Sequence, residues 1–85
     1  MEIKIEIPEY SPSNGIKYNW ENGFDIEAKY DNGRIVLKAN KAGLISLANH
    51  LLNLAQDKIP KNYHLHFDDS NSLEEGSTGL IIQKI

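Results

Sequence analysis

Residues 40–52 read NKAGLISLANHLL, and after a short loop residues 63–68 read YHLHFD. Apolar side chains recur every three or four positions in the first stretch and every second position in the next. This change of period predicts a helix followed by a strand. Asn40 is a good N-cap, and Pro60 ends helical geometry at the residue before it. The expected buried stripe of the helix is Leu44, Leu47, Ala48, Leu51, Leu54 and Ala55, with Asn49, Asn53 and Gln56 on the opposite face.

Alternating side chains predict further strands on both sides of this helix. Residues 24–30 and 34–39 alternate apolar and charged side chains and are joined at Asn32-Gly33. Both residues tolerate positive φ, so we expect a hairpin with a type I′ turn. Ile3, Ile5 and Ile7 predict a first strand, and residues 80–85 predict the last one. Residues 9–23 are rich in Pro, Ser, Asn and Gly and are expected to form a loop, with an optional short strand at 16–20.

These elements together predict an α+β fold. We expect a mostly antiparallel sheet of about five strands, with one α-helix packed on one face and the other face wet and charged. Its 85 residues fit one small domain spanning 1–85. The 40% apolar and 25% charged residues are ordinary for a folded soluble chain.

Charge and hydropathy narrow the classes of partner. Nine basic and twelve acidic side chains give a net charge of -3, which argues against nucleic acid as the partner and favours a basic protein. No run approaches the roughly 20 apolar residues of a membrane span, and the alternating amino terminus is unlike a signal peptide. We therefore expect a cytoplasmic protein without a membrane partner. The absence of cysteine excludes disulfides and thiolate metal sites.

His64, His66 and Asp68 lie two positions apart on one predicted strand face. Imidazole and carboxylate groups suit zinc and similar ions, so a small metal-binding enzyme is one alternative function. Exposed histidines on a strand are more often plain surface residues. Because the sequence fixes no fourth ligand, neither a metal site nor a cofactor is expected.

The loop after this strand carries four carboxylates, on Asp68, Asp69, Glu74 and Glu75. An EF-hand that began at Asp69 would need glycine where Glu74 stands, so these residues do not form that calcium motif. A solvated acidic loop, or an acidic patch for a basic partner, is the simpler interpretation. The chain also lacks a nucleophile elbow and a phosphate-binding loop, and no catalytic residue is expected.

Trp20 and Tyr18 lie in the predicted loop region. An amphipathic ring there could anchor an interface, as Trp and Tyr often do, or could cap the open end of a small core. His50 falls beside the apolar stripe, where a ring packed at the boundary is expected.

The stretch from Asn40 to Leu54, YHLHFD at 63–68, NSLEEGS at 71–77 and LII at 80–82 together resemble the immunity protein 32 family of bacterial polymorphic toxin systems. The resemblance covers residues 40–85. It implies a protein that binds a cognate toxin domain and blocks it, without catalysis of its own. The expected partner-binding residues are His64, His66, Asp68, Asp69, Glu74, Glu75 and Trp20. The alternatives are the metal-binding enzyme and a self-associating structural or regulatory subunit, and the sequence leaves the oligomeric state open.

Overall fold

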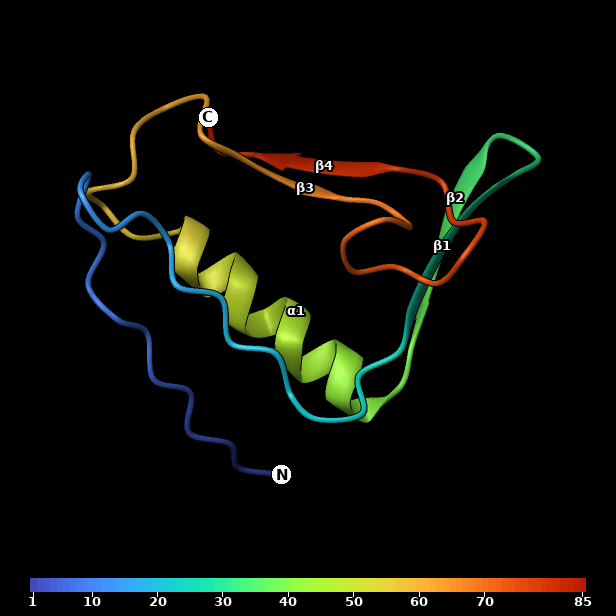
Figure 1. Cartoon of the computed structure of the whole chain (residues 1–85), viewed down its shortest axis with the longest axis horizontal. Coiled ribbons are helices and arrows are strands. Elements are labelled where there is room, and N and C mark those ends of the chain that lie inside the picture. Colours follow the sequence, from blue (N-terminus) through green and yellow to red (C-terminus); the bar gives the residue numbers. More distant parts are fainter.

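A computed structural model describes all of residues 1–85. Its elements follow the order β1 (Ile26–Asp31), β2 (Arg34–Ala39), α1 (Lys41–Leu54), β3 (His64–Phe67) and β4 (Leu80–Gln83). Figure 1 shows the β3–β4 pair lying along the helix. The β1–β2 hairpin extends from the amino-terminal end of the helix. The α+β class is confirmed.

The prediction of a single sheet of about five strands is wrong. The structure has two separate antiparallel sheets, β1–β2 and β3–β4, with two strands each. They stay separate because the segment between Glu74 and Thr78, which is not a strand, bonds along the edge of β1 that faces the rest of the fold. The polar loop thus takes the place that another strand would occupy.

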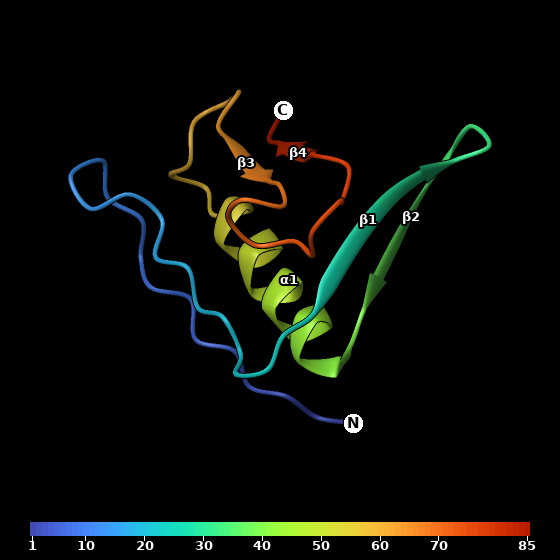
Figure 2. The same cartoon turned by 45° about the vertical axis from the view of Figure 1, so that its right-hand side comes forward.

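The predicted hairpin and its turn are confirmed. Asp31 pairs with Arg34, and the two residues between them have the positive φ values of a type I′ turn, 49° at Asn32 and 78° at Gly33. The hairpin projects well beyond the helix in Figure 2. Its outer half is therefore exposed on both faces.

The predicted helix and its cap are also confirmed. The Asn40 side chain accepts a hydrogen bond from the Gly43 amide at 2.8 Å and from the Asp25 amide at 3.0 Å. Gly43 lies where the helix crosses the start of β1: a Cβ built on it would come 2.7 Å from the Asp25 carbonyl oxygen and 2.9 Å from a side-chain carbon of Ile26. Glycine is thus required for this close approach.

The predicted buried face of the helix is only partly right. Leu47 and Leu54 are buried, but Leu44 and Leu51 are 56% and 47% exposed. The face turned to the core is instead rich in polar side chains, namely Ser46, Asn49, His50 and Asn53. Of these, Asn49 and Asn53 were predicted to face water. The amides satisfy each other, because Asn53 donates to both the side chain and the carbonyl of Asn49 at 3.0 Å.

The predicted first strand is not formed. Residues 1–9 make no backbone hydrogen bond, and none of Ile3, Ile5 and Ile7 belongs to the core or to the side chains packed against it. Residues 16–20 also form no strand; the nearest bridge joins Ser11 and Gly15. Alternation alone cannot supply the partner edge that a strand requires.

The core is a small cluster beneath the two sheets. It combines side chains from β1, α1, β3 and the loops before and after β3: Ile26, Ala28, Leu47, Leu54, Ile59, Leu65, Phe67 and Leu73. The 14-residue helix falls short of the length and apolar character needed to cross a membrane.

Candidate functional site

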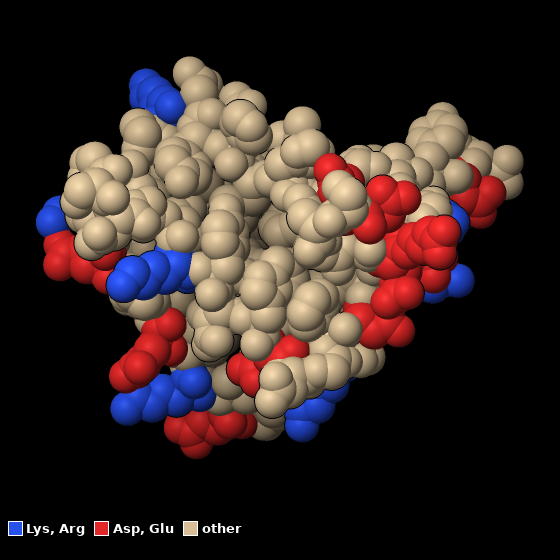
Figure 3. Space-filling view, in the orientation of Figure 1, with Lys and Arg blue, Asp and Glu red and all other residues tan.

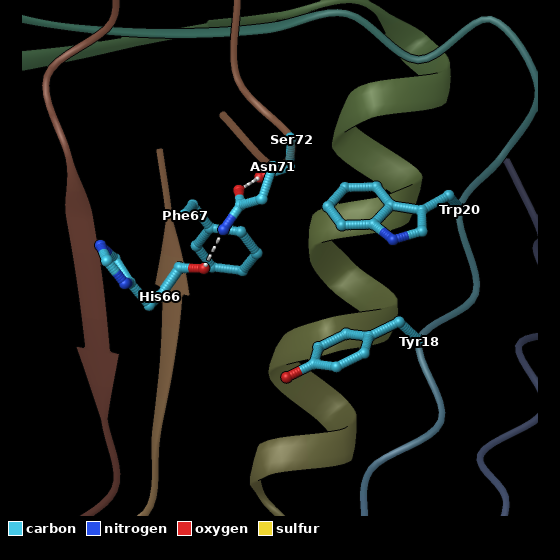
Figure 4. Close-up of a pocket in the computed structure, with 6 residues that line it drawn as sticks. All are labelled: Tyr18, Trp20, His66, Phe67, Asn71 and Ser72. Carbon is cyan, nitrogen blue, oxygen red and sulfur yellow. Dashed lines mark hydrogen bonds between the residues drawn. The ribbon is translucent and has the colours of Figure 1, made fainter. Parts of the chain in front are cut away.

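An aromatic pocket lies between the 18–20 segment and the end of β3. It has a volume of about 280 Å³ and is lined by Tyr18, Trp20, His66, Phe67, Asn71 and Ser72. Figure 4 shows Tyr18 and Trp20 reaching across the helix from one side toward Phe67 and Asn71 on the other. We call these six residues the aromatic pocket.

Three contacts hold the aromatic side of this pocket in place. The Trp20 ring stacks on Phe24 at 4.6 Å between centroids, and meets Phe67 edge to face at 6.3 Å. The next residue, Glu21, donates its amide to the Ser46 hydroxyl of the helix at 2.9 Å. Tyr18 is less enclosed, at 47% exposed, and partial burial raises the pKa of its hydroxyl. The phenol therefore stays protonated at neutral pH and can donate a hydrogen bond.

His50 lies under the two aromatic rings of this wall. Its ring centroid is 4.2 Å from that of Trp20 and 5.1 Å from that of Tyr18. The side chain is fully buried, and neither ring nitrogen has a hydrogen-bond partner. Burial lowers the pKa of His50 to about 4, so the ring is neutral at physiological pH. The predicted boundary position for His50 is wrong, because the helix turns this side chain fully inward.

The opposite wall is polar and locally braced. Asn71 donates from its side-chain amide to the His66 carbonyl at 3.1 Å, and its side-chain oxygen accepts from the Asp68 amide at 3.0 Å. Ser72 donates to the same oxygen at 2.5 Å. The pocket thus joins an apolar, aromatic wall to a wall of fixed amide and hydroxyl groups.

The predicted residues on β3 point away from this pocket. His64 and His66 alternate with the buried Leu65 and Phe67, so their rings lie on the outer face of the β3–β4 sheet, as predicted. In Figure 4 only the backbone of His66 turns toward Asn71. The His66 ring lies 3.5 Å from the Asp68 carboxylate. No group of three or more His, Asp or Glu side chains is placed to hold a metal ion.

The Asp68 carboxylate organises the start of the acidic loop. It accepts hydrogen bonds from the Ser70 amide at 2.9 Å and hydroxyl at 2.7 Å, and these bonds lower the pKa of Asp68. Asp69 accepts from the Gly76 amide at 3.2 Å, which ties the two ends of the loop together. Both carboxylates thus have local structural partners.

Glu74 and Glu75 lie apart from the other predicted residues, toward β1. A hydrogen bond with Asp25 and repulsion from that carboxylate raise the pKa of Glu74, with Glu27 adding to the effect. In Figure 3 acidic side chains gather on the side of the molecule where this loop meets β1. The structure therefore divides the predicted residues among four places: the aromatic pocket, the outer face of β3, the start of the acidic loop and an acidic cluster beside β1.

The pocket was only partly visible in the sequence. Trp20 and Tyr18 were identified from residue type, but Phe67, Asn71 and Ser72 were not connected with them. Their meeting depends on the helix, which carries the 18–20 segment on one flank and β3 on the other. A short motif gives no sign of that arrangement.

The family model described as Immunity protein 32 matches residues 34–85 of the chain. The match begins at β2 and includes the helix, both strands of the second sheet and the acidic loop. No curated protein matches the chain, and no solved structure does. The matched range contains the polar wall of the aromatic pocket, and the aromatic wall lies before it.

Proposed function

The chain belongs to the immunity protein 32 family, and on this premise we propose that it binds a cognate bacterial toxin domain and blocks it, without catalysis of its own. The match over more than half of the chain carries this proposal. The proposal includes that the protein acts in the cytoplasm of a bacterium that carries a polymorphic toxin system. The proposed function needs only a surface that a second protein can recognise.

We assign the centre of that surface to the aromatic pocket. Interfaces draw much of their binding energy from Trp and Tyr side chains in preformed hollows, surrounded by polar groups that exclude water. Trp20 is held by Phe24 and His50 in the free protein, so little side-chain entropy is lost when a partner binds. Asn71 and the Tyr18 hydroxyl supply hydrogen-bonding groups at the rim. An apolar side chain of the toxin would fill the hollow.

The acidic loop next to the pocket favours a basic toxin. Asp68, Asp69, Glu74 and Glu75 lie within eight positions. A hydrogen bond with Asp25 and repulsion from the Asp25 and Glu27 carboxylates raise the pKa of Glu74. A cationic partner would relieve that repulsion and would be drawn to this side by long-range attraction. The acidic loop thus speeds association with the toxin, and the pocket supplies the contact area.

Co-expression with the product of the adjacent gene tests the proposed function. We expect the two proteins to co-purify and the chain to restore growth of cells that make the toxin. Loss of both co-purification and rescue would overturn the proposal, provided that the neighbouring product alone is toxic.

A matched pair of tyrosine variants tests the assigned surface. Tyr18→Ala removes a half-exposed ring from the pocket, and Tyr30→Ala removes a ring that is 67% exposed on the hairpin. We expect Tyr18→Ala to weaken the complex about tenfold or more and Tyr30→Ala to leave it unchanged. Equal effects would move the toxin interface away from the pocket while leaving the immunity function intact.

A further inference from the structure

One edge of the β1–β2 hairpin is closed by the chain itself. The peptide groups of Ile26, Ala28 and Tyr30 point away from β2, and four of their N–H and C=O groups find partners in the 74–78 segment. The Ile26 and Ala28 carbonyls accept from the Glu74 and Thr78 amides at 2.9 and 2.7 Å. The Ala28 and Tyr30 amides donate to the Ser77 and Thr78 hydroxyls at 3.2 and 3.3 Å. No further strand can join the sheet along β1.

The other edge, along β2, is open. Asp31 and Arg34 close the turn as a hydrogen-bonded pair, so residues 34, 36 and 38 bond toward β1 and the peptide groups of Ile35 and Leu37 point outward. Those outward groups have no partner among the hydrogen bonds of the fold. The side chains of Ile35 and Leu37 are 63% and 41% exposed. An edge of this kind is a template for an incoming strand.

The charges on β2 define what that strand should carry. Arg34, Val36 and Lys38 lie on the face of the hairpin opposite to Ile35 and Leu37. Arg34 pairs with Asp31 of β1, and Lys38 pairs with Glu27 of β1. A strand that joined the open edge would therefore need acidic residues four positions apart. It would need apolar residues beside Ile35 and Leu37.

Residues 2–6 of this chain, EIKIE, have that pattern. Glu2 and Glu6 are four positions apart, with Ile3 and Ile5 between them and Lys4 at the centre. The order of acidic, apolar, Lys, apolar and acidic residues repeats that of β1 from Glu27 to Asp31. These residues make no backbone hydrogen bond in the structure, and Ile3 is 42% exposed. The segment is thus an unpaired strand sequence that matches an unpaired edge.

The segment cannot reach the open edge of its own copy while its anchor holds. Tyr10 donates its amide to the Gln56 side chain at 2.9 Å, and Glu9 forms an ion pair with Lys58, both beyond the C-terminal end of the helix. The hairpin joins the helix at the other end, about 21 Å away for 14 residues. Three extended residues from Glu9 to Glu6 span only about 10 Å. Figures 1 and 2 show the amino-terminal segment running beside the helix, while the hairpin extends away from the helix.

We propose that residues 2–6 of one copy add as a third strand to β2 of a second copy. In either strand direction Glu2 and Glu6 then face Arg34 and Lys38, and Lys4 stands opposite Val36. Ile3 and Ile5 lie beside Ile35 and Leu37 and extend the apolar face of the hairpin. Each cation of β2 gains a second carboxylate, opposite the one that β1 already supplies. This surface is separate from the aromatic pocket, so the proposal does not depend on toxin binding.

Sedimentation at increasing protein concentration measures this association. We expect self-association of the wild-type chain and at least about a tenfold weaker association for Glu2→Lys/Glu6→Lys at low salt, because lysines would then face Arg34 and Lys38. The variant should keep its fold, since residues 1–9 make no backbone hydrogen bond in the fold. Glu21→Lys/Asp57→Lys makes the same change in net charge on exposed residues elsewhere and should associate like the wild type. A monomer at every concentration, or an equal effect of both variants, would overturn the proposal.

Cysteine crosslinking identifies the paired strands. The chain has no cysteine of its own, so Lys4→Cys/Val36→Cys introduces one pair at the centre of the proposed contact. Oxidation should give disulfide-linked copies, and a mixture of the two single variants should give a linked heterodimer. A disulfide within one copy would show that the segment pairs with its own hairpin. That result, or the absence of any disulfide, would contradict pairing between copies.

Discussion

The ring of His50 lies 4.2 Å from the Trp20 ring, with both of its nitrogen atoms buried and without a hydrogen-bond partner. A group in this position cannot take up a proton without placing a charge among aromatic rings. The floor of the aromatic pocket is therefore sensitive to acid, and this sensitivity can be measured.

Stability should fall as the pH is lowered from 7 to 5. His50 has an ordinary pKa of about 6.5 in the unfolded chain and about 4 in the folded one. Well above pH 6.5 it is neutral in both states. Between 6.5 and 4 the unfolded chain binds a proton that the folded chain does not, so the free energy of unfolding drops. We expect a loss of about 2 kcal/mol between pH 7 and pH 5, measured by urea denaturation.

His50→Leu provides the control for this pH dependence. Leucine fills a similar volume and carries no titratable group, so the variant should lose the part of the drop that belongs to His50. It should also be at least as stable as the wild type at pH 7, because it removes two unpartnered buried nitrogens. A variant with the wild-type pH profile would assign the acid sensitivity to other groups.

Two leucine variants should separate the real core from the periodic pattern. Leu65 is 1% exposed and packs in the central cluster, whereas Leu51 is 47% exposed on the helix. Leu65→Ala should lower the free energy of unfolding by about 2 to 5 kcal/mol, and Leu51→Ala by less than about 1 kcal/mol. Thermal or chemical denaturation of both variants checks this. A large loss at Leu51 would mean that the exposed side of the helix is covered in solution.

Gly43→Ala should destabilise the protein, although alanine is the better helix former by about 1 kcal/mol. The new methyl group would lie 2.7 Å from the Asp25 carbonyl oxygen and 3.1 Å from the Ala39 side chain. Relief would require the helix and the hairpin to move apart, at a cost of about 1 to 3 kcal/mol. Ala48→Gly, farther along the same helix, serves as the control for the effect of helix propensity. Stabilisation by Gly43→Ala would show that the crossing can relax freely.

Reversal of the two glutamates beside β1 should slow association with the toxin. Glu74→Lys/Glu75→Lys reverses the charge of the two loop glutamates and leaves the loop bonds of Asp68 and Asp69 in place. We expect the association rate constant to fall about tenfold at low salt and the difference to shrink at high salt. Stopped-flow mixing with the purified toxin measures it. An unchanged rate at low salt would remove the acidic loop from the encounter surface.

The sequence predicted local structure well and the location of partners poorly. Asn32 and Gly33, Asn40 and the 40–54 period each act through neighbours in the chain, and the structure confirms the turn, the cap and the helix. The assignment of Asn49 and Asn53 to the wet face was wrong because apolar spacing takes no account of amides that can pair with each other inside. The pattern at Ile3, Ile5 and Ile7 indicated a strand, yet a strand forms only against an available edge. The aromatic pocket depends on tertiary contacts between segments about 50 residues apart.

The closure of β1 by the 74–78 segment makes the hairpin a template with one side only. A free two-stranded ribbon can recruit strands in both directions and so can act as the seed of a growing sheet. Here the hydroxyls of Ser77 and Thr78 accept hydrogen bonds from the Ala28 and Tyr30 amides and prevent growth of the sheet along β1. The number of strands that one copy can accept directly is thus fixed at one. Loss of those two hydroxyls would leave only the Glu74 and Thr78 amides bonded to this edge and would weaken the barrier to aggregation on that side.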